Sequence, residues 1–130
     1  MSKRRVVITG LGTINPLGNN VTSTWEKLTN GISGIDHITQ FDTSSLPVTF
    51  AGEVKDFDAN DYMGKQHARK LDRSAHLSIY ATEQALQDAG FDTEERLGPN
   101  VGIVFGTGIG GIGATEDAVR VYDSRGPSRI

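Results

Sequence analysis

The chain has 130 residues, which is close to the usual size of one compact domain, so a single hydrophobic core is the first expectation. Thirteen basic and sixteen acidic residues give a net charge of −3, which argues against general electrostatic binding to nucleic acid. The chain has no cysteine, which excludes disulfides, thiolate metal sites and a cysteine nucleophile within these residues. Its three histidines are scattered along the sequence, so we expect no metal site.

The sequence favours a cytoplasmic protein. The basic residues at the start precede only a short apolar run, whereas a signal peptide needs a longer one. No segment approaches the roughly 20 apolar residues of a membrane span. We therefore expect neither secretion nor membrane insertion.

The first predicted element is a strand over residues 5–9. Its centre, Val6-Val-Ile8, is apolar without alternation, which is typical of a strand covered on both faces. A glycine-rich turn follows over residues 10–18. The pattern Ser23-Thr-Trp-Glu26 is a capping-box pattern and predicts a short helix with Trp25 and Leu28 facing inward.

The middle of the chain contains one clear helix. We expect a loop over 31–47, a short strand over 48–54 and an irregular stretch over 56–64. Residues 72–89 then show helical periodicity, with His76, Tyr80 and Gln84 away from a stripe of small and apolar residues. The stripe consists of Leu71, Ala75, Ile79, Thr82, Leu86 and Ala89.

The last third of the chain repeats the order of strand, turn and helix. A second buried-type strand is predicted over 101–105, a glycine-rich turn over 106–113 and a helix over 115–122. Phe105, like Trp25, is expected in the core. The order of elements predicts an α/β fold with parallel strands and crossover helices. Two strands would leave both sheet edges unpaired, so we expect further sequence to complete the sheet.

The glycine cluster has three possible interpretations. Gly106-x-Gly108-x-x-Gly111 fits the dinucleotide fingerprint, in which glycines let backbone amides approach a phosphate at a helix N-terminus. The acidic residue that should follow a second strand is missing, because Asp123 falls in a predicted turn. The glycines could otherwise serve a tight strand-to-helix connection, or leave room for an acyl chain or thioester.

A basic run spans residues 65–73 in this otherwise acidic chain. Lys65, Arg69 and Arg73 are spaced four apart and would share one helical face if the helix extends back this far. Such a run is either a solvated helix face or a docking patch for an acidic partner.

Several motifs in one order resemble the beta-ketoacyl-acyl-carrier-protein synthase family. The resemblance covers the whole chain and looks most like the synthase II branch, the long-chain elongating enzymes of bacterial fatty-acid synthesis. The matching motifs are Arg5-Val-Val-Ile-Thr-Gly-Leu-Gly12, Asn15-Pro-Leu-Gly18, Thr24-Trp25, Gly31-x-Ser-Gly34, Phe41-Asp42, Phe50-Ala-Gly52, Arg69-Lys-Leu-Asp72, Ala85-x-Gln-Asp-Ala-Gly90, Gly106-Thr-Gly-Ile-Gly-Gly111 and Gly126-Pro127.

The resemblance implies a thiolase-like layered α/β/α/β/α fold, usually in a homodimer. Residues 1–130 would be the first part of the N-terminal half, without an internal boundary. The implied reaction is decarboxylative condensation of malonyl-carrier protein with acyl-carrier protein, using a cysteine nucleophile and two histidines. In the family these residues lie beyond the equivalent of Ile130, so we expect no catalytic residue within this chain.

Two site roles carry over from the family to this sequence. Gly108 and Ile109 match positions that border the acyl-chain pocket near the dimer interface. A basic carrier-protein surface is matched by Lys65, Arg69, Lys70 and Arg129, whereas Gln66 and Ser128 stand where synthase II can carry Lys or Arg. The implied partner is acyl carrier protein, and no cofactor is expected because the substrates ride on its phosphopantetheine arm.

Other functions stay open at this point. The chain could belong to a non-catalytic chain-length partner, in which a glutamine replaces the downstream cysteine, or to a polyketide ketosynthase. It could also be a nucleotide-binding module that uses the glycine cluster, or a fragment that only dimerises or docks carrier protein.

Overall fold

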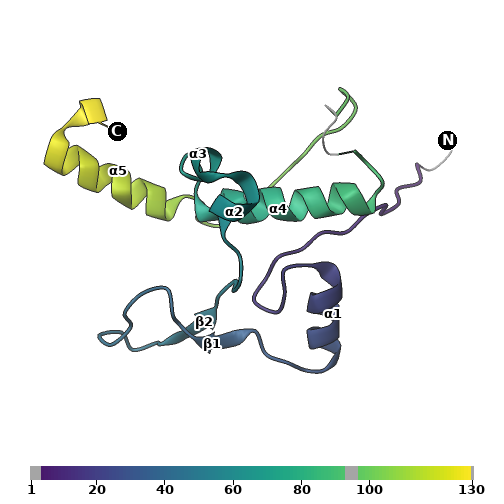
Figure 1. The fold of residues 1–130 in the computed structure, drawn as a ribbon, viewed down its shortest axis with the longest axis horizontal. Helices are drawn as coiled ribbons and strands as arrows, with labels where there is room; N and C mark the ends of the chain where they lie inside the picture. Colours follow the sequence, from purple (N-terminus) through teal and green to yellow (C-terminus); the bar gives the residue numbers. More distant parts are fainter. Residues whose placement is uncertain (1–3, 93–96, 130) are drawn as a thin grey trace. The chain divides into compact units, whose positions relative to one another are not determined.

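A computed structural model describes residues 4–92 and 97–129 of the chain (Figure 1). Its elements are α1 (Val21–Thr29), β1 (Ile35–His37), β2 (Phe50–Gly52), α2 (Ala59–Met63), α3 (Lys65–Ala68), α4 (Arg73–Asp88), α5 (Ile112–Arg125) and the 3-10 helix η1 (Pro127–Arg129). They fall into two compact units, residues 1–57 with 79–101 and residues 58–78 with 102–130. Helix α4 contributes its first turns to the second unit and the rest to the first unit.

In the first unit, residues 10–19, here called the N-terminal segment, run along α4 (Figure 1). The Leu11 amide donates to the Asp88 carboxylate at 2.8 Å. The Gln84 side-chain amide donates to the Thr13 and Asn19 carbonyl oxygens at 3.2 and 3.0 Å. These bonds satisfy one backbone donor and two backbone acceptors in a segment that pairs with no strand in the described part of the chain.

Close approach to α4 requires glycine at two positions of this segment. A Cβ atom on Gly10 would lie 2.6 Å from the Ala89 nitrogen, and one on Gly12 would lie 2.6 Å from the Ala85 nitrogen. Both contacts are with helix backbone, which cannot rotate away as a side chain can. The glycines of the predicted turn therefore permit close packing against the helix.

Helix α1 begins one turn earlier than predicted. Its N-cap is Asn20, whose side-chain oxygen accepts from the Ser23 amide at 2.8 Å. The capping-box interpretation, with Ser23 as the cap, was wrong. Trp25 is also 64% exposed and Leu28 54% exposed, so neither faces inward as predicted.

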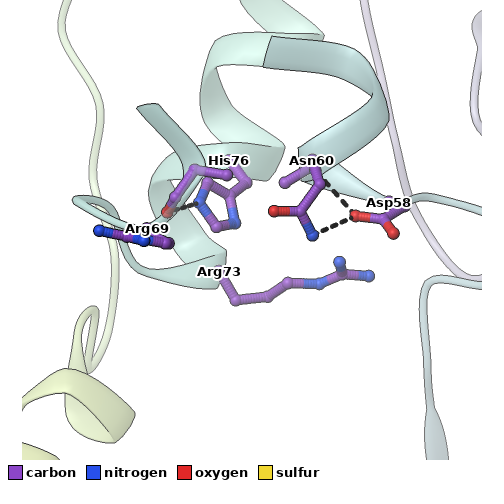
Figure 2. Close-up of a pocket in the computed structure, with 7 residues that line it drawn as sticks. Asp58, Asn60, Arg69, Arg73 and His76 are labelled. Atoms are coloured by element: carbon purple, nitrogen blue, oxygen red, sulfur yellow. Dashed lines mark hydrogen bonds between the residues drawn. The ribbon is translucent and has the colours of Figure 1, made fainter. Parts of the chain in front are cut away.

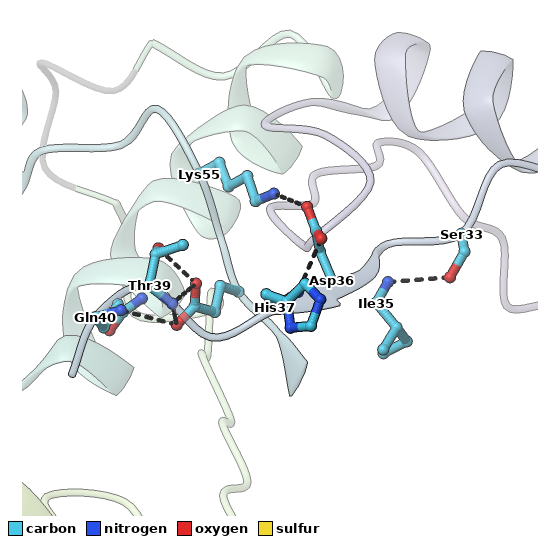
Figure 3. Close-up of polar contacts among 8 residues, drawn as sticks. Ser33, Ile35, Asp36, His37, Thr39, Gln40 and Lys55 are labelled. Atoms are coloured by element: carbon cyan, nitrogen blue, oxygen red, sulfur yellow. Dashed lines mark hydrogen bonds and ion pairs between the residues drawn. The ribbon is translucent and has the colours of Figure 1, made fainter. Parts of the chain in front are cut away.

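Strands β1 and β2 form a short antiparallel pair in which Asp36 is opposite Ala51. An ion pair between Lys55 Nζ and Asp36 Oδ2, 2.7 Å long, ties the start of this pair to the segment after it (Figure 3). The Lys55 ammonium lowers the pKa of Asp36, and the Asp36 carboxylate raises the pKa of Lys55. The Glu53 carboxylate accepts from the Thr39 and Gln40 amides (Figure 3).

The second unit contains α2, α3, the start of α4, α5 and η1. Asp58 caps α2, and Gly64, with φ of +78°, separates α2 from α3. Ala59 and Ala68 are the two core residues among those the structure describes. His76 Nε2 lies 2.9 Å from the Ala68 carbonyl oxygen, so this nitrogen carries the proton and joins α4 to the end of α3.

The predicted helices over 72–89 and 115–122 are confirmed as α4 and α5. Four other expectations were wrong. Asp123 lies within α5 and not in a turn, the stretch 56–64 contains α2, the loop predicted over 31–47 contains β1, and the sheet in the described residues is antiparallel and not parallel. The short strand expected over 48–54 is confirmed as β2.

The strands predicted over 5–9 and 101–105 do not form in the described chain. Val6 is 93% exposed and Val104 97% exposed, and Phe105 is also exposed and not in a core. A strand requires a backbone partner, and the described residues provide none for either segment. Of the helices in the described ranges, none combines the length and apolarity needed to cross a bilayer.

Candidate functional site

The glycine loop, residues 106–111, is an exposed turn that leads into α5. Ile109 at its centre is 76% exposed. A Cβ atom on Gly106 or Gly108 would meet no atom within 4 Å, so the backbone on either side of Thr107 is open to a neighbouring molecule. The loop therefore presents one apolar side chain beside accessible backbone.

The loop is fixed at its far end by Gly111 and Asp72. Gly111 is the N-cap of α5 and has φ of +76°, a left-handed conformation that favours glycine. It supplies no side-chain cap, and the Ala114 amide instead donates to Asp72 Oδ2 at 3.4 Å. The Ser74 amide and then the Ala114 amide lower the pKa of the Asp72 carboxyl, so it is ionised at neutral pH.

This arrangement argues against nucleotide binding at the glycine loop. The dinucleotide fingerprint needs the helix N-terminus to receive a phosphate, because amides and the helix dipole favour an anion there. In this chain the anion at the start of α5 is the Asp72 carboxylate. A phosphate at the same place would meet like charge.

The docking segment, residues 65–70, does not form one helix with α4. Helix α3 ends at Ala68, Arg69 is its C-cap, and α4 begins at Arg73. The helix therefore does not extend back to Lys65, and the condition for Lys65, Arg69 and Arg73 to share one helical face is not met. Lys65, Arg69 and Lys70 are all exposed, and none of them forms an ion pair with another described residue.

Arg129, the fourth residue expected on the docking surface, lies on a separate element. It is the last residue of η1, which follows α5 directly. The structure thus places Lys65, Arg69 and Lys70 on one short segment and Arg129 on another element of the same unit. Which surface they form together remains a prediction.

A cationic pocket of about 360 Å³ opens beside the docking segment (Figure 2). The Asp58 Oδ1 atom in it accepts from the Asn60 amide at 2.7 Å and from the Asn60 side chain at 2.8 Å. The pocket is suited to a small anion such as a carboxylate or phosphate. It is lined by Asp58, Ala59, Asn60, Ala68, Arg69, Arg73 and His76.

Sequence reasoning missed the parts played by His76 and Asp72. His76 was placed on the polar side of the helix without a role, yet it lines the pocket with Arg69 and Arg73. The spacing of Arg73 and His76, three apart in the first turn of α4, was a usable signal. Asp72 was visible as the single acid in the basic run.

The chain belongs to the beta-ketoacyl synthase family. The family described as "Beta-ketoacyl synthase, N-terminal domain" matches residues 3–129. The resemblance drawn from the motifs is therefore confirmed.

Three curated relatives of this chain carry the same protein name. The chain is similar to proteins named 3-oxoacyl-[acyl-carrier-protein] synthase 2 in three bacteria. It is 42% identical over 129 residues to that of Synechocystis sp. (strain ATCC 27184 / PCC 6803 / Kazusa), 44% over 130 residues to that of Vibrio harveyi and 41% over 127 residues to that of Staphylococcus aureus (strain COL). These matches cover 99%, 100% and 98% of this chain, but the chain spans only 31% of the length of each relative.

Solved structures confirm the expected fold class, the thiolase-like layered α/β fold of ketosynthases. One is a type II polyketide synthase acyl carrier protein in complex with its ketosynthase bound to the hexaketide. It matches at a TM-score of 0.65 and 30% identity, covering 99% of this chain and 34% of that chain. The ishigamide ketosynthase/chain length factor matches at a TM-score of 0.64 and 32% identity, covering 72% of this chain and 23% of that chain.

Proposed function

We propose that this chain is the N-terminal part of an acyltransferase of fatty-acid biosynthesis. The enzyme would condense malonyl-carrier protein with acyl-carrier protein to give 3-oxoacyl-carrier protein and CO₂. The observation that carries this proposal is identity of 41–44% to proteins named 3-oxoacyl-[acyl-carrier-protein] synthase 2 over nearly the whole chain. The cysteine thiolate that accepts the acyl group would lie outside these residues, because the chain contains no cysteine.

Within that enzyme, this chain would form part of the acyl pocket and part of the surface that binds the carrier protein. Ile109 on the exposed glycine loop would border the acyl chain, with the open backbone of Gly108 beside it. Lys65, Arg69, Lys70 and Arg129 would attract the carrier protein, which is strongly acidic. The cationic pocket beside Arg69 would receive one of its carboxylates.

The proposal extends to the oligomeric state, the location and the cofactor requirement of the enzyme. The enzyme would work as a homodimer in the cytoplasm. It would need no cofactor of its own, because its substrates arrive as thioesters on the phosphopantetheine arm of the carrier protein. Support for the carrier protein as partner comes from the similar ketosynthase whose structure contains one.

A charge reversal at Lys70 tests the docking surface. In the intact enzyme, we expect Lys70→Glu to raise KM for acyl-carrier protein by about three- to tenfold at low salt, because exposed charges mainly steer the encounter. KM for the matching acyl-CoA should stay near the wild-type value. Lys27→Glu, the same change on an exposed residue of α1, is the control and should alter neither constant. Equal effects of Lys70→Glu on both substrates would contradict the docking role.

One alternative is supported by a particular comparison. The ishigamide structure contains a chain length factor, so the chain could belong to a partner subunit without a nucleophile. The synthase and the partner subunit would share the fold and the acyl pocket. A cysteine in a strand-to-helix turn of the downstream sequence would indicate the synthase, whereas a glutamine there would indicate the partner subunit.

A further inference from the structure

Asp72 connects two elements through its two carboxylate oxygens. Oδ1 accepts from the Ser74 amide at 3.1 Å and from the Ser74 hydroxyl at 3.3 Å, which holds the start of α4. Oδ2 accepts from the Ala114 amide, 42 residues away, in the first turn of α5. Because the two oxygens serve different elements, the two contacts can be changed separately.

The contact with α5 replaces a cap that this helix lacks. Amides in the first turn of a helix have no intrahelical acceptor, and Gly111 offers no side chain to provide one. The first backbone bond of α5 runs from the Thr115 amide to the Gly111 carbonyl at 2.9 Å. The Ala114 amide lies just before it, so Asp72 supplies the acceptor at the point where the helix starts.

The glycine loop also lies close to the same turn. A Cβ atom on Gly110 would lie 3.3 Å from the Ser74 hydroxyl oxygen, which shows that loop backbone packs closely on the start of α4. Ile109 is the residue next to Gly110. The loop thus lies near Ser74, and the helix that follows it is capped by Asp72.

We propose that Asp72 is a positioning residue that holds the glycine loop and so determines where Ile109 meets the acyl chain. This inference rests on the proposed function, since it needs Ile109 to border the acyl pocket. Asp72 would then contribute to chain-length selectivity without touching substrate. Since Lys70 lies two residues before Asp72, the docking segment and the acyl-pocket loop would depend on one turn.

The test measures selectivity in the intact enzyme, as the ratio of kcat/KM for a long and a short acyl-carrier protein. Asp72→Asn keeps an acceptor for Ser74 but turns an NH₂ group toward Ala114. We expect it to move the ratio toward equal use of both chains by about threefold or more. Asp117→Asn makes the same chemical change on the exposed face of α5, where the carboxylate pairs with Arg120, and should leave the ratio unchanged.

Ala114→Pro removes the same hydrogen bond from the donor side. Proline is tolerated in the first turn of a helix, and the Ala114 amide makes no intrahelical bond here. We expect Ala114→Pro to shift the ratio as Asp72→Asn does, and the double variant to add no further shift. If Asp72→Asn fails to fold, Ala114→Pro alone decides the question.

Ile109→Phe separates the two ideas that could fail. If it lowers use of the long chain while Asp72→Asn and Ala114→Pro leave the ratio at the wild-type value, the role of Asp72 is wrong and the acyl pocket stands. If Ile109→Phe affects long and short chains equally, the proposed pocket is wrong, and the inference about Asp72 falls with it.

Discussion

Single residues govern the contact between the N-terminal segment and α4. Gln84 belongs to the polar side of the predicted helix, yet its side-chain amide holds two carbonyl oxygens of this segment. Ile79, on the predicted apolar stripe, is 42% exposed. In this chain the helix therefore binds its neighbour through a polar residue and through close backbone approach at Gly10 and Gly12.

Gly12→Ala should destabilise the first unit. The added Cβ atom would approach the Ala85 nitrogen and the Gln84 Cβ atom within 3 Å, and helix backbone cannot move aside. We expect the free energy of unfolding to fall by about 1–3 kcal/mol, as for other overpacked sites. Urea unfolding measures this loss.

Gly98→Ala is the matched control for this substitution. A Cβ atom there would meet nothing within 4 Å, so the change should stay within about 0.5 kcal/mol of wild type. If the two variants unfold at the same urea concentration, the N-terminal segment does not pack on α4 as described.

At the scale of elements, the start of α1 has two candidate N-cap residues, Asn20 and Ser23. Asn20 accepts from the Ser23 amide at 2.8 Å, whereas the Ser23 hydroxyl only donates to the Asn20 carbonyl at 3.2 Å. Asn20→Ala should therefore cost about 1 kcal/mol of stability, as expected for loss of an N-cap. Ser23→Ala should cost about 0.5 kcal/mol or less. Thermal unfolding of both variants checks the order, and the reverse order would restore Ser23 as the cap.

Local signals predicted α1, α4 and α5 but not their environment. The periodicity of α4 and the glycine after it are contained in consecutive residues, so its bounds could be read within one or two positions. The cap of α1 was misread because Asn20 and Ser23 are both good cap residues and only backbone geometry distinguishes them. The contact of Asp72 with Ala114 joins residues 42 apart, which no local pattern specifies.

In the candidate site, too, local motifs could be read from the sequence, whereas contacts between separate elements could not. Lys65, Arg69, Lys70 and Ile109 were identified from motifs shared with a family, and the structure leaves them exposed as a binding surface requires. The sequence left open whether the helix extends back over Lys65 and Arg69, because no proline or glycine marks the position between α3 and α4. The pocket beside it arises from residues of α2, α3 and α4 together, and sequence spacing alone does not bring them to one place.

At the scale of the whole molecule, the two apolar segments over 5–9 and 101–105 stand out. Both have the unalternating pattern of strands buried on two faces, yet both are exposed in this chain. The chain matches ketosynthase structures while spanning 31% of the length of its curated relatives. We infer that both segments join a sheet whose other strands come from the rest of the intact protein.

Val104→Asp tests that inference in two contexts. In the 130-residue chain, where Val104 is 97% exposed, the substitution should leave helicity by circular dichroism unchanged and reduce self-association in sedimentation. In the intact protein the same carboxylate would be buried without a partner, which costs several kcal/mol and should prevent soluble expression. Thr22→Asp adds the same charge on exposed α1 without removing an apolar surface, so it should be tolerated in both contexts. Normal stability of the intact Val104→Asp protein would show that residues 101–105 remain at the surface there too.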